Sequence, residues 1–139
     1  MPCMVLVRDP EAAVRSLVVR NQRPEHVDRY LGEYIGFYGA VRRCLPQVLV
    51  VPFHQVHSDI GAIFHDLNSK FGTDFAAYEP TAQNEAAVAA KLAERNRGRG
   101  DNYWYLPSQQ RAAALAAVDW NPNARMLKRA KSIHSQVLS

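Results

Sequence analysis

Cysteine, long hydrophobic runs and glycine-rich phosphate motifs are scarce or missing in this sequence. Its 139 residues include two cysteines, Cys3 and Cys44, which are too few for a disulfide scaffold and favour a reducing compartment. No apolar stretch approaches the roughly 20 residues that a membrane-spanning helix needs. The first residues also lack the charged start and the apolar region of a secretory signal. We therefore expect a cytoplasmic protein without a membrane partner.

A metal site is likewise not expected. His54, His57 and His65 gather after a predicted strand, but zinc would need a further ligand in a tight tetrahedral geometry. Since no cysteine lies near them in sequence, Asp59 or Asp66 would have to serve. We expect these histidines at the surface or as helix caps. An alternative is that one of them is a general base beside a substrate hydroxyl.

The composition indicates one globular domain with a basic balance. Hydrophobic residues make up 47% of the chain, enough for a core within a single domain spanning residues 1–139. The net charge is +4, and 13 arginines stand against four lysines. Guanidinium groups suit bidentate recognition of phosphate or sulfate, so an anionic partner is favoured. The same charge can also serve solubility alone.

The pattern of apolar residues predicts an α/β fold. Two continuous apolar runs, residues 3–8 and 47–52, are typical of strands covered on both faces. Ser58 is expected to cap the third helix, and Gly72 to end it in the left-handed conformation. About six helices are expected, at residues 10–22, 25–43, 59–71, 82–94, 108–118 and 122–137.

The two predicted strands are expected to pair in parallel. A connection that contains helices joins parallel strands, so a partial parallel sheet is expected. Independent stability usually takes at least three strands. We therefore expect either that the chain lacks a strand or that it pairs with another chain along the open edge, as in a homo-oligomer.

Three glycines interrupt the second predicted helix. Each of Gly32, Gly36 and Gly39 costs ~1 kcal/mol relative to alanine. Close packing against another backbone would account for them, and a substrate channel is the alternative interpretation.

The most specific chemical signal is the pair Arg8 and Ser16. Asp9 is a favoured N-cap and Pro10 fits the first helical turn, so Arg8 lies where a strand leads into a helix. Ligands bind at this edge of open α/β sheets, and helix N-termini favour anions. Ser16 lies about 200° around the helix from Val14, so it faces away from the core and could meet the same phosphate as Arg8. Alternatively, Arg8 pairs with a carboxylate and Ser16 is an ordinary exposed serine.

The segment around this pair resembles a known binding motif. Residues 7–17 read Val-Arg-Asp-Pro, then five residues, then Ser-Leu. This segment is similar to the 3′-phosphate-binding motif of the PAPS-dependent sulfotransferases, a P-loop family. Residues 68–75, N-S-K-F-G-T-D-F, and 107–111, P-S-Q-Q-R, resemble the bacterial branch of that family. The resemblance implies that Arg8 and Ser16 bind the co-substrate PAPS (3′-phosphoadenosine 5′-phosphosulfate). It also implies a transferase that moves a sulfuryl group to a hydroxyl or amine of a small acceptor.

Part of the family's pattern has no counterpart in the chain. Only seven residues precede Arg8, and no G-x-x-x-x-G-K-[ST] sequence occurs. The chain looks like the C-terminal two-thirds of a sulfotransferase-like domain, without the first strand and the phosphosulfate loop. Its catalytic residues are therefore unknown, and little or no activity is expected of it alone. A truncated fragment without its own activity is an alternative.

A second function class rests on one basic segment. From Arg95 to Tyr105 the sequence R-N-R-G-R-G-D-N-Y-W-Y combines three arginines with three aromatics in a predicted loop. One interpretation is a basic lid over an anionic nucleotide. The other is a small module that binds single-stranded nucleic acid through phosphate contacts and base stacking. Of the two partners, nucleic acid is the less favoured one.

Overall fold

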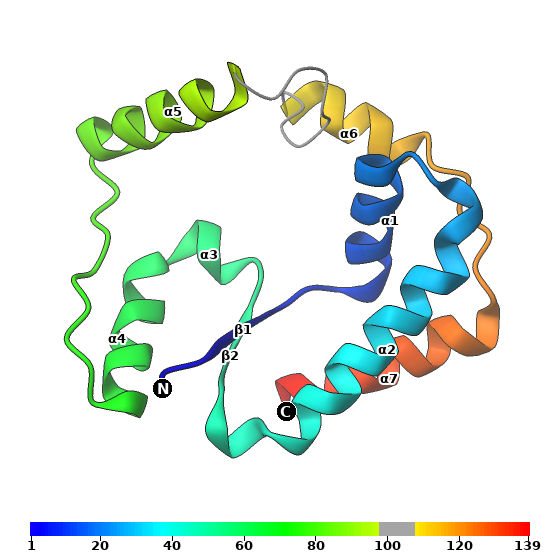
Figure 1. Ribbon diagram of the computed structural model, residues 1–139, viewed down its shortest axis with the longest axis horizontal. Helices are drawn as coiled ribbons and strands as arrows, with labels where there is room; N and C mark the ends of the chain where they lie inside the picture. Colours follow the sequence, from blue (N-terminus) through cyan, green and yellow to red (C-terminus); the bar gives the residue numbers. More distant parts are fainter. Residues whose placement is uncertain (98–107) are drawn as a thin grey trace.

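The chain folds as a short sheet flanked by helices (Figure 1). The computed structural model describes residues 1–97 and 108–139. The elements follow in the order β1 (Met4–Val7), α1 (Pro10–Asn21), a 3₁₀ turn η1 (Pro24–His26), α2 (Val27–Arg43), a 3₁₀ turn η2 (Leu45–Gln47), β2 (Leu49–Pro52), α3 (Gln55–Ser58), α4 (Ile60–Phe71), α5 (Ala82–Arg97), α6 (Ser108–Ala116) and α7 (Ala124–Leu138).

The two strands pair in parallel, as the sequence predicts. Met4 lies opposite Leu49 and Val7 opposite Pro52. Helices α1 and α2 form the connection between the strands, which is the crossover that parallel pairing requires. The α/β fold class is confirmed, with seven α-helices in the described part of the chain where about six were expected.

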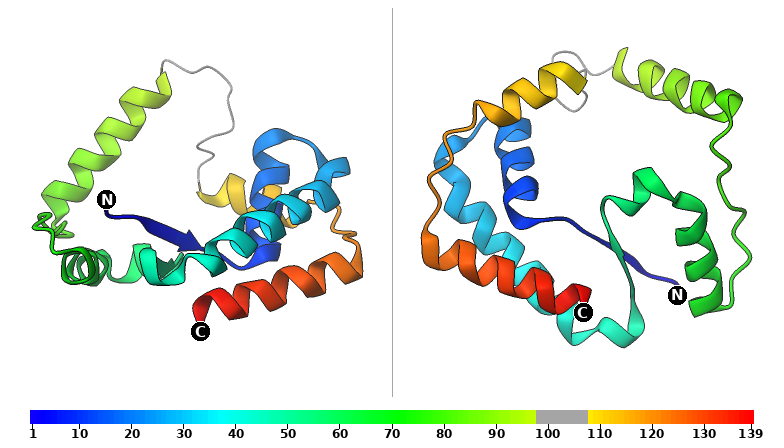
Figure 2. Two further views of the ribbon diagram at one scale, coloured as in Figure 1. Left: turned by 60° about the horizontal axis from the view of Figure 1, so that its bottom comes forward. Right: turned by 180° about the vertical axis from the view of Figure 1, so that it is seen from behind.

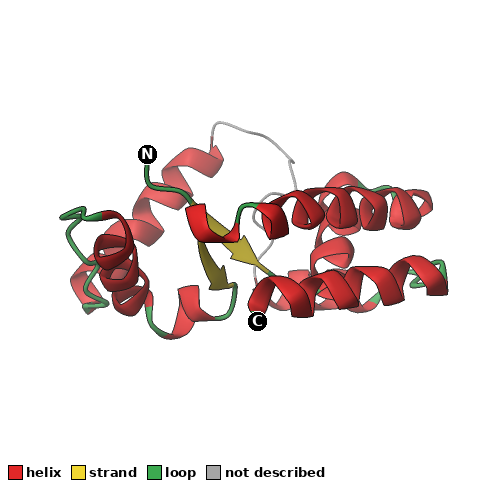
Figure 3. Ribbon diagram, turned by 90° about the horizontal axis from the view of Figure 1, so that it is seen from below, coloured by secondary structure: helices red, strands yellow, loops and turns green. Residues whose placement is uncertain are grey.

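Helices α1, α2 and α7 surround the main core. Figure 1 and Figure 3 show α2 and α7 side by side, with α1 against α2. Burial of each large aliphatic side chain in such a core contributes about 1.5–3 kcal/mol. The buried residues of this cluster are Val14, Val18, Val27, Tyr30, Leu31, Tyr34 and Ala130. A second cluster, Val7, Val41, Ile133 and Val137, joins the sheet to the ends of α2 and α7.

The expectation that both faces of the strands are covered is wrong for β1. Val7 is 2% exposed because its face of the sheet packs against α2 and α7. Met4 and Leu6 alternate with that face and are 43% and 38% exposed. Successive side chains of a strand point to opposite faces, so one layer of helices covers one face of β1 only.

The start of α1 agrees with the sequence. The Asp9 side chain accepts a hydrogen bond from the Ala12 amide at 3.0 Å, and Pro10 occupies the first turn. The helix ends at Asn21, and Gln22 follows in the left-handed conformation. Arg8 is thereby held directly between β1 and α1.

The predicted cap of the third long helix is wrong. Ser58 belongs to the short α3, where its hydroxyl donates to the His54 carbonyl oxygen at 3.3 Å. Asp59 has non-helical backbone angles, and its side chain accepts from the Ala62 amide at 2.9 Å, so Asp59 caps α4. The end of α4 is confirmed, because Gly72 has a φ of 62°.

Close backbone packing does not account for the glycines of α2. A Cβ at Gly32 would lie 3.6 Å from Met126 Cε, which is ordinary side-chain contact. A Cβ at Gly36 or Gly39 would meet nothing within 4 Å. The expectation of a second backbone against these two positions is therefore wrong.

Helix α5 is longer than expected. It reaches Arg97, so the predicted loop at residues 95–105 is wrong for Arg95, Asn96 and Arg97. The remaining residues of that predicted loop lie outside the described part of the chain. Arginine is a good helix former, and cations near a helix C-terminus interact favourably with the dipole. Figure 2 shows α5 apart from the α1–α2–α7 group. Of the helices described, none combines the length and apolar character required to span a bilayer.

Candidate functional site

Arg8 and Ser16 line one pocket, on the α1–α2 side of the sheet. The cavity has a volume of about 390 Å³ and is bordered by β1, α1, α2 and Phe53. Both side chains are partly buried. Ser16 faces away from Val14, which is fully buried, as the helical spacing predicts. The full lining is Leu6, Arg8, Ala13, Val14, Ser16, Leu17, Arg20, Tyr30, Glu33, Tyr34, Phe37, Tyr38 and Phe53.

The position of Arg8 is determined by two aromatic residues. Its guanidinium carbon lies 4.8 Å from the centre of the Phe53 ring, a cation–π contact. Its carbonyl oxygen accepts a hydrogen bond from the Tyr34 hydroxyl at 2.7 Å. Burial lowers the pKa of Arg8, the nearby charge of Arg111 lowers it further, and Asp9 opposes both. The guanidinium is therefore a partly desolvated cation beside a second cation.

Arg111 is the site residue that sequence reasoning missed. Its Nη2 donates a hydrogen bond to Ser16 Oγ at 3.2 Å from the first turns of α6. Arg111 and Arg8 have no ion-pair partner among residues 1–97 and 108–139. The one signal in the sequence is that Arg111 ends the P-S-Q-Q-R segment, whose resemblance to the bacterial branch does not by itself point to a chemical role.

Arg15 connects α6 to α1. Its Nε and Nη2 donate to Glu11 Oε1 at 3.1 Å, and its Nη1 donates to the Leu115 carbonyl oxygen at 3.3 Å. The same guanidinium lies 4.7 Å from the centre of the Trp120 ring. Arg15 therefore holds α6 where Arg111 can reach Ser16.

Side chains, rather than the helix end, are the donors of this site. The Asp9 carboxylate already accepts from the first turn of α1, so the positive end of that helix has an anionic partner. Arg8 and Ser16, with Arg111 bonded to Ser16, are the side-chain donors left to meet a ligand. Because Ser16 accepts from Arg111, its own hydroxyl hydrogen is available to donate.

Aromatic rings form much of the rest of the pocket. Phe37 is 56% exposed and contacts Tyr38 edge-on, with ring centres 5.0 Å apart. Glu33 is the carboxylate of the lining, and it pairs with Arg29 at 3.0 Å. An anion with an attached flat ring would find both charge and stacking surface here.

None of the three histidines lines this pocket. His57 contacts Phe53 edge-on at 5.7 Å between ring centres, and His65 is exposed on α4. His54 borders a separate pocket on the other side of Arg8, together with His134. Within the described residues, no three His, Cys, Asp or Glu side chains are grouped so that they could hold a metal ion.

The arrangement is suited to binding a phosphate or sulfate ester, because Arg8 and Ser16 line one pocket and Arg111 is bonded to Ser16 at its edge. Comparison of the chain with protein-family models, with curated proteins and with solved structures found no match.

Proposed function

We propose that this protein binds a 3′-phosphorylated adenosine nucleotide of the PAPS type and belongs to a sulfotransferase-like fold. In this proposal Arg8 clamps the 3′-phosphate, Ser16 donates a hydroxyl hydrogen bond to it, and Arg111 adds a second guanidinium. The observation that carries the proposal is the pocket shared by Arg8 and Ser16, with Arg111 bonded to Ser16.

The size and lining of the pocket support a nucleotide over a free anion. Its volume of about 390 Å³ lies within the range of small-molecule sites. The exposed ring of Phe37 offers a stacking surface for adenine at the rim. The two exposed free thiols, Cys3 and Cys44, support a reducing, cytoplasmic location.

The proposed reaction is in-line transfer of a sulfuryl group from the bound PAPS to an acceptor. An acceptor hydroxyl or amine forms the new bond to sulfur as the bond from sulfur to the phosphate oxygen breaks, and the acceptor proton passes to a base. Catalysis of this kind depends on positioning and on neutralising charge. In this proposal the chain holds the nucleotide by its 3′-phosphate. We assign the base that accepts the proton to no residue.

Calorimetry with 3′,5′-adenosine bisphosphate and with plain 5′-AMP tests the proposal. We expect the bisphosphate to bind at least about tenfold more tightly, since a charge-assisted hydrogen bond contributes about 1.5–3 kcal/mol. Arg8→Ala should remove most of this difference. Arg23→Ala is the charge-matched control, because Arg23 is exposed and paired with Glu25.

Two results would contradict the proposal. One is equal, weak binding of both nucleotides. The other is a salt-dependent affinity for single-stranded nucleic acid that is lost in the Arg95→Ala, Arg97→Ala double variant and unaffected by Arg8→Ala. That second result would favour the nucleic-acid-binding module.

A further inference from the structure

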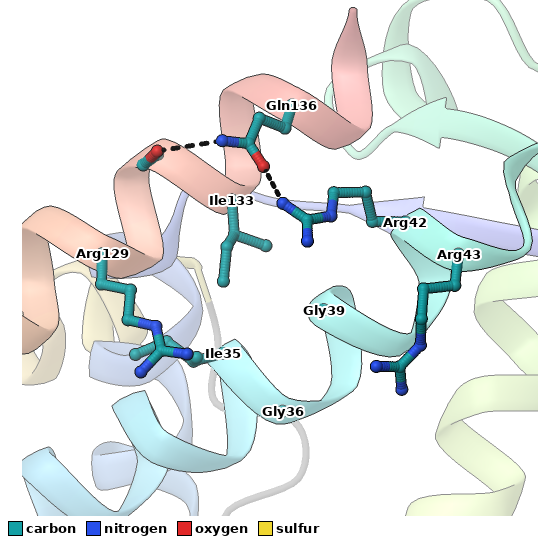
Figure 4. A pocket seen from close by; sticks show the side chains of 9 residues that line it. Ile35, Gly36, Gly39, Arg42, Arg43, Arg129, Ile133 and Gln136 are labelled. Carbon is teal, nitrogen blue, oxygen red and sulfur yellow. Dashed lines mark hydrogen bonds between the residues drawn. The ribbon is translucent and has the colours of Figure 1, made fainter.

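A second basic pocket lies on the opposite side of α2, where α2 meets α7 (Figure 4). Its volume is about 480 Å³, and its lining shares no residue with that of the Arg8 pocket. The lining consists of Ile35, Gly36, Gly39, Arg42, Arg43, Arg129, Ser132, Ile133 and Gln136. We refer to it as the α2–α7 groove.

Three arginines and no carboxylate border the α2–α7 groove. Arg42 and Arg43 come from the last turn of α2, and Arg129 comes from the middle of α7. None of the three has an ion-pair partner in the described part of the chain. The negative end of the α2 dipole stabilises the charges of Arg42 and Arg43. Arg129 lies in the middle of α7, where no helix end stabilises its charge. Three like charges around one hollow therefore repel one another unless an anion lies between them.

One hydrogen bond across the groove, from Arg42 to Gln136, holds Arg42 in place, and a bond within α7 orients Gln136. Gln136 Nε2 donates to Ser132 Oγ at 3.3 Å, and Gln136 Oε1 accepts from Arg42 Nη1. Figure 4 shows Arg42 extending from α2 toward α7 and Arg129 extending from α7 toward Ile35 on α2. The two guanidinium groups thus cross the groove in opposite directions. A side chain held in this way loses less conformational entropy when a ligand binds.

Gly36 and Gly39 leave the backbone of α2 uncovered within the groove. Since a Cβ at either position would meet nothing within 4 Å, packing inside the chain does not account for these glycines. Each costs ~1 kcal/mol relative to alanine in a helix. A ligand that approaches the helix between the arginines would use the space that the missing side chains leave.

We propose that the α2–α7 groove binds a small anion with at least two phosphate or sulfate groups, bridging Arg42 on one helix and Arg129 on the other. The axes of packed helices lie about 8–10 Å apart, so arginines that extend from both helices into one groove can contact a single diphosphate-sized ligand. Arginine's planar fork suits bidentate contact with each anionic group. The inference is independent of the nucleotide proposed for the Arg8 pocket.

Site-resolved NMR titration of the whole chain with inorganic pyrophosphate tests this proposal. We expect the amide signals of Gly36 and Gly39 and the Nε–H signals of Arg42 and Arg129 to shift together and saturate. Signals of Ala13 and Leu17, which border the Arg8 pocket, report on that pocket separately. Arg42→Ala and Arg129→Ala should each weaken binding at the groove about tenfold or more.

Arg125→Ala is the matched control, because Arg125 is an exposed arginine of α7 that does not line the groove. It should change the affinity less than about twofold. The substituted positions are exposed, so the variants should keep the native amide spectrum. Pyrophosphate that binds no tighter than orthophosphate would overturn the proposal. So would equal weakening by all three substitutions, or the absence of saturation at about 10 mM ligand.

Discussion

Arg111 Nη2 and Ser16 Oγ form a hydrogen bond of 3.2 Å between residues 95 positions apart in the chain. The bond joins α6 to α1 at the edge of the pocket that Arg8 lines. It brings a second guanidinium within electrostatic reach of Arg8, where the two cations disfavour each other. An anion between them would remove that repulsion, which is the physical basis of the proposed site.

Ser16 and Arg111 are expected to act together in nucleotide binding. We predict that Ser16→Ala and Arg111→Ala each weaken binding of 3′,5′-adenosine bisphosphate by about three- to tenfold. The double variant should lose less than the sum of the two free-energy changes, because residues in one hydrogen-bond network are coupled. Calorimetry on the four proteins of the double-mutant cycle measures the coupling. Strict additivity would mean that the two residues do not share a ligand.

Arg15 is expected to affect the same binding without touching the pocket. Arg15→Ala removes the contacts with Leu115 and Trp120 that hold α6 against α1. We predict a several-fold loss of affinity for the bisphosphate in the otherwise native chain. The same substitution should have little effect when Arg111 is already alanine, since its influence passes through that residue. An equal loss in both backgrounds would indicate a general loosening of the fold.

The capping residue of α4 can be identified by a matched pair of substitutions. Asp59→Ala should lower the free energy of unfolding by about 1 kcal/mol, because the Ala62 amide loses its partner. Ser58→Ala should change it by less than about 0.5 kcal/mol, since the Ser58 hydroxyl bonds only to the exposed end of α3. Urea unfolding measures both. A larger effect at Ser58 than at Asp59 would restore the cap that the sequence predicted.

Tyr34 is expected to make the fold sensitive to alkali. Burial raises the pKa of its hydroxyl above the ordinary value of 10.0, with smaller contributions from Tyr38 and Asp9. Above pH 10 the unfolded chain therefore loses this proton while the folded chain retains it, so stability falls as the pH rises. Below pH 10 both the folded and the unfolded chain keep this proton, so the contribution of Tyr34 to the free energy of unfolding is fully present.

Urea midpoints at about pH 8 and about pH 11 measure this effect. The loss between the two should be smaller in Tyr34→Phe than in the native chain. Tyr78→Phe is the control, because Tyr78 lies between α4 and α5 and has no hydrogen bond in the described part of the structure. An unchanged alkaline loss in Tyr34→Phe would show that other groups dominate it.

Much of the local structure could be read from the sequence. The apolar runs predicted β1 and β2, Asp9 and Pro10 predicted the start of α1, and Gly72 predicted the end of α4. These features depend on backbone preferences and on the period of apolar side chains, which act within a few residues. The cap at Asp59 was missed because α3 is a single turn, too short to give a periodic signal.

The sequence alone determined that Arg8 follows a strand and that Ser16 faces away from the core of its helix. Tertiary structure decided that Arg111 reaches Ser16 and that Arg42 and Arg129 cross one groove. The reason is that local preferences set the direction of a side chain from its own element. Contacts between α1 and α6, or between α2 and α7, depend instead on how those elements pack. No short-range pattern in the chain records that packing.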